Sequence, residues 1–298
     1  MRILDEAAVR SYLSMEELIP AMSSALSDLS SKKAVQPVRT ILPVAEHKGF
    51  LGVMPAYNNA LGAKLVTFYP ENQGIHTHNG VIILFRPETG EPMALMDGRL
   101  ITEMRTAAVS AVATDLLANR DTHTLAIIGS GVQARSHLEA LRIVRSFAEV
   151  RVWSPRNAKR FADENGITAC ASAEEVVTGS DVVVVATGAQ TPVLFGRWLK
   201  PGTHINAIGA NRPTWRELDD DVMNMSRIFV ESRESALVES GDLIAAGRIV
   251  AEIGEVVAGS AEGRQSKEDI TLFKSLGTAV EDIAAADLVY RKATGSTI

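Results

Sequence analysis

The sequence predicts an α/β protein in which a Rossmann-type nucleotide domain with a parallel sheet is joined to an α+β domain. In segment 124–134 a short apolar run ends in Gly-Ser-Gly-Val-Gln-Ala, and an amphipathic helical pattern follows at once. From residue 122 onward, strand and helix patterns alternate, which is typical of a parallel sheet with crossover helices. The length of 298 residues exceeds one ordinary domain. We therefore expect two domains that share a cleft.

The composition is that of a folded protein with a sizeable core, because 46% of the residues are hydrophobic and 22% are charged. A net charge of -6 argues against nucleic acid or an anionic membrane as the main partner. With a single cysteine, Cys170, the chain cannot form an intramolecular disulfide framework. We expect Cys170 to be a small core residue rather than a nucleophile. Charged residues interrupt any apolar signal near Met1, and no segment has the length of a membrane span. We therefore expect a soluble cytoplasmic protein.

Residues 1–118 combine helix and strand patterns and are expected to form the substrate-binding and dimerisation domain. The stretch 1–34 is largely helical in pattern, with Ser14 as the expected cap of its main helix. An alanine-rich helix is expected over 101–117. A turn at 87–90 joins the last two strands into a hairpin. The expected strands lie at 38–42, 49–55, 62–68, 81–85 and 93–96.

Residues 119–277 are expected to form the nucleotide domain. After residue 243 the signal weakens, leaving a strand-like run at 270–273 and a final helix from about 279 to 290. We expect this helix, within 278–298, to pack back on the first domain. The other expected strands lie at 125–128, 150–153, 168–171, 182–186, 204–208 and 228–230.

The glycine-rich turn predicts a dinucleotide site. Gly129 permits the tight turn, Gly131 lets the backbone approach a pyrophosphate, and Ala134 replaces the third glycine where helix and strand pack. The free N–H groups and the positive end of the helix then face the phosphates. Such a pattern alone is often accidental, but the strand before it and the helix after it favour a nucleotide site over a plain turn. The residues assigned to the turn are Gly129, Ser130, Gly131, Val132 and Gln133.

The end of the second strand of the nucleotide domain, at 150–153, favours NADP(H) over NAD(H). An NAD site usually carries Asp or Glu at this place, whereas a nearby Arg accommodates a 2′-phosphate. Here the first acid after the strand is Asp163, and Ser154 and Arg156 offer a hydroxyl and a guanidinium. NADH remains an alternative cofactor, and Arg156 and Arg160 are alternatively a solvated helical face.

Three cations in the first domain are candidates for binding a small carboxylate. Arg39, Lys64 and Arg105 each lie beside apolar strand or helix patterns, so they are candidates to point into a cleft. Apolar residues flank Lys64 on both sides, and partial burial would lower its pKa towards a useful acid–base range. The alternative is that these are structural or surface cations.

Several motifs together resemble the ornithine cyclodeaminase and mu-crystallin family, and most of all its ketimine reductase branch. The similarity runs through nearly the whole chain, and the stretch 211–220 is specific. The motifs are the glycine-rich turn, Asp97-Gly98, Thr-Glu-Met-Arg-Thr-Ala-Ala at 102–108, Asn-Arg-Pro-Thr-Trp-Arg-Glu-Leu-Asp-Asp at 211–220, Phe-Lys-Ser-Leu-Gly at 273–277 and Ala-Val-Glu-Asp at 279–282.

The resemblance implies a homodimer built through the first domain and the C-terminal helix. It implies that Arg39, Lys64 and Arg105 hold the substrate carboxylate, and that Thr77 is a cleft residue. His76 and His78 suggest a metal pair, but no third ligand is in view and the family is not metal-dependent, so we expect no metal. The remaining residues that we assign are Ser275 for the substrate and Ala186, Thr187 and Gly209 for the cofactor.

One departure from the family decides between its branches. Cyclodeaminases carry aspartate and lysine where this chain has Asn211 and Trp215. Forming proline from ornithine needs a base, and an amide cannot accept that proton. Reduction of a cyclic ketimine does not need this base, because the substrate is already an imine. Its protonated form is the electrophile, and the hydride comes from nicotinamide. Asn211 and Lys64 are expected to position or protonate the imine nitrogen.

We therefore expect NAD(P)H-dependent reduction of small cyclic imino acids, namely Δ1-pyrroline-2-carboxylate or Δ1-piperideine-2-carboxylate, to proline or pipecolate. Three alternatives stay open. The first is a lyase with internal redox chemistry, such as an ornithine cyclodeaminase or a hydroxyproline dehydratase. The second is an amino-acid dehydrogenase acting on alanine, and the third is a non-catalytic mu-crystallin-like binding protein.

Overall fold

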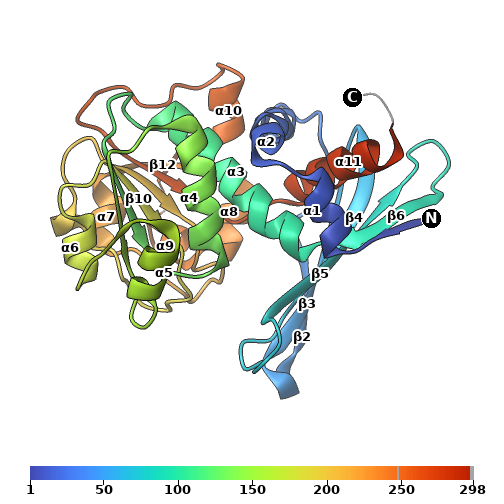
Figure 1. The fold of residues 1–298 in the computed structure, drawn as a ribbon. Coiled ribbons are helices and arrows are strands. Elements are labelled where there is room, and N and C mark those ends of the chain that lie inside the picture. Colours follow the sequence, from blue (N-terminus) through green and yellow to red (C-terminus); the bar gives the residue numbers. More distant parts are fainter. Residues whose placement is uncertain (247, 296–298) are drawn as a thin grey trace. The chain divides into compact units, whose positions relative to one another are not determined.

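The protein is described by a computed structural model that covers residues 1–246 and 248–295 (Figure 1). The chain divides into two compact units. Unit 1 comprises Met1–Arg105 and the chain from Gly277 onward, and unit 2 comprises Thr106–Leu276. The boundary between the units lies between Arg105 and Thr106, inside the long helix α3 (Arg99–Leu117). The sequence predicts it after residue 118, at the end of this helix.

Unit 1 contains a six-stranded mixed sheet in the order β1-β6-β5-β4-β3-β2. Strand β1 runs parallel to β6, and all other neighbours are antiparallel. The five expected strands and the hairpin are confirmed, whereas the short edge strand β1 was not expected. The bounds are β1 (Arg2–Leu4), β2 (Thr40–Val44), β3 (Gly49–Asn58), β4 (Ala60–Phe68), β5 (His78–Phe85) and β6 (Pro92–Asp97).

Helices cover one face of this sheet. Helix α11 (Ala279–Thr294) packs against α2 (Met15–Ser30) and against β3 and β4, and α1 (Glu6–Tyr12) packs against β6 and α11. Ser14 is the N-cap of α2, as predicted. The covered face carries a row of neighbours, Met54, Lys64, Ile82 and Met96, all of them buried. A lysine thus interrupts an apolar row. A short 3-10 helix, η1 (Ala45–His47), joins β2 and β3.

Unit 2 contains an eight-stranded, all-parallel sheet of Rossmann type in the order β13-β12-β14-β11-β10-β7-β8-β9. The seven expected strands are confirmed. Strand β13 was not expected, because it is a four-residue edge strand with one buried residue. The bounds are β7 (Thr124–Ile128), β8 (Glu149–Trp153), β9 (Thr168–Ala169), β10 (Val182–Val185), β11 (His204–Ala207), β12 (Ser226–Val230), β13 (Ile249–Glu252) and β14 (Ile270–Lys274).

The helices of unit 2 connect these strands, and the central strands are buried as parallel strands require. The chain order reverses at β7, which lies between β8 and β10, and ligands of such sheets bind at this switch point. The helices are α4 (Val132–Val144), α5 (Ala158–Asn165), α6 (Ala173–Val177), η2 (Gly196–Trp198), α7 (Asp220–Met225), α8 (Arg233–Glu239), α9 (Gly241–Ala246) and α10 (Ile253–Val257).

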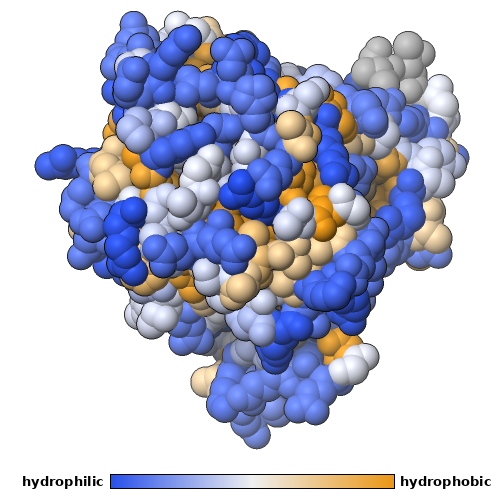
Figure 2. Space-filling model, turned by 60° about the vertical axis from the view of Figure 1, so that its left-hand side comes forward, coloured by the Kyte–Doolittle hydropathy of each residue, from blue (hydrophilic) through white to orange (hydrophobic). Residues whose placement is uncertain are grey.

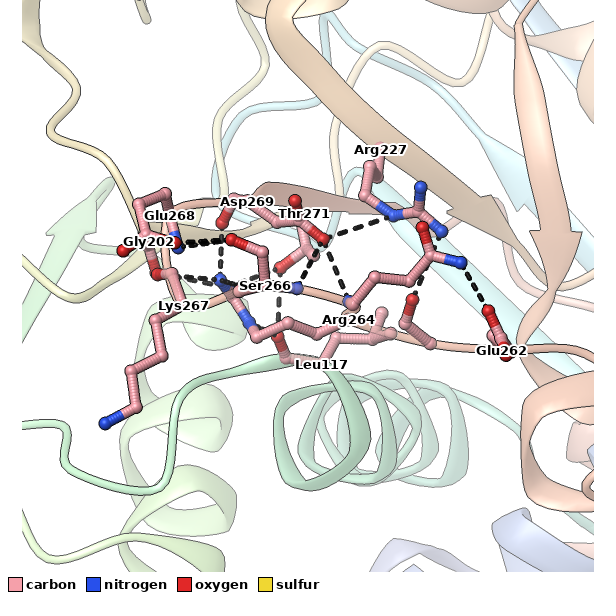
Figure 3. A network of polar contacts seen from close by, with 12 residues as sticks. Leu117, Gly202, Arg227, Glu262, Arg264, Ser266, Lys267, Glu268, Asp269 and Thr271 are labelled. Carbon is pink, nitrogen blue, oxygen red and sulfur yellow. Dashed lines mark hydrogen bonds and ion pairs between the residues drawn. The ribbon is translucent and has the colours of Figure 1, made fainter.

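Arg264 fastens the C-terminal end of α3 to the sheet of unit 2 (Figure 3). Its Nε donates to the carbonyl oxygen of Leu117 at 2.6 Å, and its Nη2 donates to Gly202 O at 3.1 Å and to Thr271 Oγ1 at 3.0 Å. The carboxylate of Asp269 accepts backbone N–H bonds from the same loop. The last carbonyl oxygens of a helix have no hydrogen-bond donor within the helix, and the Arg264 guanidinium supplies a donor to one of them.

Within the described residues, no helix has both the length and the apolarity that a membrane span requires. Figure 2 shows one face of the molecule, on which hydrophilic residues surround smaller apolar patches.

Candidate active site

The glycine-rich turn of unit 2 has the geometry of a phosphate-binding turn. Gly129 has φ +121°, and a Cβ there would lie 2.3 Å from the carbonyl oxygen of Ala186, so only glycine fits. Gly131 is the N-cap of α4, and a Cβ there would meet no atom within 4 Å. Val132 and Gln133 form the first turn of α4. Open space beside the first N–H groups of a helix suits a pyrophosphate.

Two hydrogen bonds tie this turn to the end of β8. The Gly129 amide donates to Trp153 O at 2.8 Å, and the hydroxyls of Ser130 and Ser154 lie 2.8 Å apart. Arg156 follows in the exposed loop before α5. Arg160, by contrast, pairs with Glu164 on α5 itself at 3.8 Å. Ser154 is therefore beside the turn, where a nucleotide ribose is expected.

The other predicted residues of unit 2 follow the ends of three neighbouring strands. Ala186 N donates to Ile128 O, and Ser275 N donates to Ala207 O, each at 2.9 Å. Thr187 directly follows Ala186, and Gly209 lies two residues beyond the end of β11. These residues thus share the carboxyl edge of the sheet with the glycine-rich turn. Ser275 is buried, and its Oγ donates to Glu231 Oε1 at 2.7 Å.

A buried ionic cluster, Glu217, Asp242 and Lys274, supports this edge and was not predicted from sequence. Glu217 accepts hydrogen bonds from Thr187 N at 3.1 Å and from Thr187 Oγ1 at 2.6 Å. Lys274 Nζ donates to Gly209 O and lies 3.9 Å from Glu217 and 3.6 Å from Asp242. Burial raises the pKa of Glu217 to about 7, although Lys274 and the Thr187 hydroxyl oppose the rise.

Asn211 lies in the exposed loop that follows β11. With its amide nitrogen facing two carbonyl oxygens, it donates to Gly209 O at 2.9 Å and to Ile208 O at 3.0 Å. The preceding residue, Ala210, has φ +54°, a left-handed conformation that costs a non-glycine residue free energy. The guanidinium of Arg212 stacks 4.6 Å from the ring centre of Trp215. The loop therefore holds Asn211 in a defined conformation.

Unit 1 brings together the three predicted cations around the start of α11. Lys64 Nζ lies 2.6 Å from Asp282 Oδ2 and donates to Thr102 Oγ1 at 3.3 Å. The Arg105 Nε donates to Asp282 Oδ1 at 2.9 Å, so both cations share one carboxylate. All three charged side chains are almost completely buried.

Two further contacts complete this cluster. Arg105 Nη1 donates to Glu281 Oε2 at 2.6 Å, and Arg39 Nη2 donates to Gly277 O at 2.7 Å. Gly277 has φ +74°, and a Cβ there would lie 2.4 Å from Arg105 Nη1. The left-handed backbone favours glycine at this position, and a larger residue would also require the Arg105 guanidinium to move.

The environment of Lys64 shifts its acidity as predicted. Burial lowers the pKa of Lys64 to about 8, Asp282 opposes the decrease, and the charges of Arg105 and Arg39 add to it. Burial alone would raise the pKa of Asp282, but Arg105 and Lys64 together hold it below its ordinary value. The pKa of Lys64 is therefore closer to neutral pH than that of an exposed lysine.

Thr77 does not lie with this cluster along the sheet. Lys64 pairs with Ile82, whereas Thr77 accepts a hydrogen bond from Tyr69 N beyond the ends of β4 and β5. Ile82 lies five positions after Thr77, which is about 17 Å of extended chain. His76 is exposed in the loop before β5, and His78 is exposed at the first position of β5. Among the described residues, no group of three or more His, Cys, Asp or Glu is placed to bind a metal.

The comparisons with known proteins establish the family. The model of the ornithine cyclodeaminase/mu-crystallin family matches residues 1–297. The chain belongs to this family. It is 50% identical to the ketimine reductase mu-crystallin of Mus musculus over 286 residues, covering 92% of this chain and 91% of the relative.

Solved structures of two relatives agree with this assignment. The Δ1-pyrroline-2-carboxylate reductase of Thermococcus litoralis, in complex with NADH and L-proline, has a TM-score of 0.95 at 41% identity and covers 99% of this chain and 98% of its own. An archaeal alanine dehydrogenase dimer with bound NAD has a TM-score of 0.94 at 36% identity, covering 100% of this chain and 97% of its own. The Rossmann-type unit and the mixed-sheet unit thus form one family fold.

Proposed function

We propose that this protein is an NAD(P)H-dependent ketimine reductase that reduces small cyclic imino acids, with Δ1-pyrroline-2-carboxylate giving L-proline and Δ1-piperideine-2-carboxylate giving L-pipecolate. The observation that carries the proposal is the buried cluster of unit 1, in which Lys64, Arg105 and Asp282 meet. The relatives are a ketimine reductase and a reductase bound to proline, which supports the same chemistry.

The chemistry of the cluster suits a substrate carboxylate. It gathers the cations Arg39, Lys64 and Arg105 around the start of α11, and Lys64 and Arg105 are almost completely buried. Guanidinium groups bind carboxylates with strong charge-assisted hydrogen bonds, so these side chains suit the carboxylate of a cyclic imino acid.

Lys64 is the proton donor in this proposal. As the imine carbon is reduced, the electron pair of the C=N π bond moves to the nitrogen, which takes a proton from the Lys64 ammonium. Lys64 is left as a neutral amine and regains its proton from water. A pKa of about 8 makes the donor both charged and acidic enough at neutral pH. Thr102, which accepts a hydrogen bond from Lys64, helps to orient the ammonium.

Unit 2 fits a dinucleotide, because the open space at Gly131 and the start of α4 suit its pyrophosphate. When bound, the nicotinamide supplies the hydride. Ser130 and Gln133 would flank the phosphates, and Ser154 and Arg156 would hold a 2′-phosphate. We therefore place NADPH before NADH, although the two solved relatives carry NADH and NAD. Arg156 and the lack of a carboxylate between Trp153 and Lys159 support this preference.

Asn211 favours reduction over cyclodeamination. Its amide cannot accept a proton, so it does not provide the base that cyclodeamination needs. We assign it to orienting the substrate ring. Alanine dehydrogenase remains the second candidate because one relative has that activity. That reaction needs free ammonia in the reductive direction, which distinguishes it from the reduction of a preformed cyclic imine.

A homodimer is part of the proposal, and the uncovered face of the unit 1 sheet supports it. The face opposite Lys64 carries apolar side chains at paired positions on β2 to β5, and Leu42 is 59% exposed, Val81 40% and Leu65 37%. Apolar area of this kind usually marks a protein interface. The archaeal relative is a dimer. A second copy of the chain is the expected partner.

The decisive experiment follows nicotinamide absorbance with purified protein and Δ1-pyrroline-2-carboxylate, with NADPH and with NADH in parallel. Fast oxidation without ammonia supports the reductase. Oxidation that requires pyruvate and ammonia points to alanine dehydrogenase. No oxidation of either nucleotide, in protein that binds NADPH, refutes the proposal and favours a lyase or a binding protein.

A further inference from the structure

Asp282 contacts both Lys64 and Arg105 through its carboxylate. Its Oδ2 lies 2.6 Å from Lys64 Nζ, and its Oδ1 accepts from Arg105 Nε at 2.9 Å. Asp282 lies in the first turn of α11, and its side chain is fully buried. A carboxylate in the first turn of a helix is also stabilised by the helix dipole. It is therefore a fixed negative charge between two side chains of the proposed site.

We propose that Asp282 is a positioning residue for imine reduction, which holds the ammonium of Lys64 and the guanidinium of Arg105 in register and keeps Lys64 charged until it donates its proton. This inference rests on the proposed function, because it assigns Lys64 to proton transfer. It adds a residue that binds neither substrate nor cofactor and acts through two that bind substrate.

The charges around Lys64 explain why Asp282 carries this role. Lys64 is packed in the sheet between Met54 and Ile82, which offer no charge. Helix α3 presents Thr102 and Arg105, the segment before β2 presents Arg39, and α11 presents Asp282. Both arginines oppose the charged form of Lys64, as burial does. Among these groups Asp282 is therefore the counter-charge that offsets the burial of the ammonium.

The neighbouring Glu281 supplies a matched control. It is equally buried, lies in the same helical turn and binds Arg105 through Nη1 at 2.6 Å. Glu281 also accepts from the Thr278 amide at 3.2 Å. The substitutions Asp282→Asn and Glu281→Gln each remove one carboxylate from Arg105, but Asp282→Asn alone removes the 2.6 Å contact with Lys64.

The first measurement is the pH profile of kcat/KM for the imine. Wild-type activity should fall as the pH rises through the pKa of Lys64, because the proton donor is lost. In Asp282→Asn this basic limb should move about one to three pH units lower, which is the usual effect of one close opposite charge. In Glu281→Gln it should stay near the wild-type position. Equal displacement in both variants, or none in either, overturns the proposal.

The second measurement needs no turnover. With lysine labelled by ¹³C at Cε, the NMR titration of the Lys64 resonance, identified by its loss in Lys64→Met, gives its protonation directly. Asp282→Asn should titrate at lower pH than wild type, and an unchanged titration overturns the proposal. A wild type that reduces no imine refutes the proposed function, whereas this titration still tests the link between Asp282 and Lys64.

A further pair of variants tests the proposal if Asp282→Asn does not fold. Asp282→Glu keeps the charge but moves the carboxylate by one methylene, so it cannot keep both contacts. We expect kcat/KM for the imine to fall about a hundredfold, as a displacement near 1 Å does. Asp287→Glu, the same change in length on the same helix, alters an ion pair with Arg291 outside the cluster and should retain most activity. A profile of Asp282→Glu equal to that of wild type contradicts the proposal.

Discussion

Replacing Lys274 by Met tests the buried ionic cluster of unit 2. Lys274 is fully buried beside Glu217 and Asp242, and it donates to the carbonyl oxygen of Gly209. A methionine fills a similar volume but removes the cation that lies 3.6 Å from Asp242 and one of the donors to Gly209 O, while Arg216 stays 3.8 Å from Asp242. Removing one partner of a buried ion pair costs about 3–5 kcal/mol. A surface pair costs about 0.2–1 kcal/mol, so Lys159→Met, which breaks an exposed 2.8 Å pair with Asp163, is the control.

Urea denaturation followed by tryptophan fluorescence is the suitable assay. The three tryptophans of the chain, Trp153, Trp198 and Trp215, all lie in unit 2, so their emission reports its unfolding. With a denaturant slope of about 2 kcal/mol/M, Lys274→Met should lower the midpoint by roughly 1.5–2.5 M. The Lys159→Met midpoint should fall by less than about 0.5 M.

A small loss in Lys274→Met would refute this reasoning. If both variants lose less than about 1 kcal/mol, the cluster has the stability of a surface pair and its burial is not decisive. The double variant Lys274→Met with Asp242→Asn adds a second check. It removes the Asp242 charge together with that of Lys274, so it should be more stable than Lys274→Met alone.

Three further predictions concern the two units separately. Arg156→Ala should raise KM for NADPH far more than KM for NADH, and an equal rise for both in steady-state kinetics would remove Arg156 from 2′-phosphate binding. Lys64→Met should lower kcat by about 10²–10⁴-fold with unchanged NADPH affinity by fluorescence titration, and near-normal turnover would exclude Lys64 as proton donor. Gly277→Ala should lower the melting temperature and weaken substrate binding, because a Cβ would lie 2.4 Å from Arg105 Nη1. A stable variant with an unchanged KM for the imine would show that the chain can shift there without loss.

The sequence predicted the fold in detail wherever a local pattern carried the information. The Gly129 turn, the apolar strands of the parallel sheet and the Ser14 cap are each encoded by neighbours in the chain, so they were predictable. The edge strands β1 and β13 were not, because three or four residues without a buried face leave no periodic signal. Propensity and periodicity describe a segment, whereas edge pairing depends on what lies beside it.

The candidate sites show the same limit. Lys64 could be predicted because apolar residues flank it on the strand, and its low pKa follows from that burial. Its counter-ion Asp282 lies more than 200 residues away in sequence, and no pattern links the two. Lys274 did leave a signal. It ends the apolar run Ile270–Lys274, and a lysine in a buried strand needs a buried partner. The identity of that partner required the fold.

The two buried ionic clusters differ in the sign of the charge that burial disfavours. In unit 2 that charge is an anion, because burial raises the pKa of Glu217 to about 7 although Lys274 opposes the rise. In unit 1 it is a cation, because burial lowers the pKa of Lys64 to about 8 and the charges of Arg105 and Arg39 add to the decrease. A negative charge beside Lys64 favours its ammonium form. Under the proposed function, binding of the substrate carboxylate therefore raises the pKa of Lys64, so the substrate itself favours the protonated state of the donor that its reduction needs.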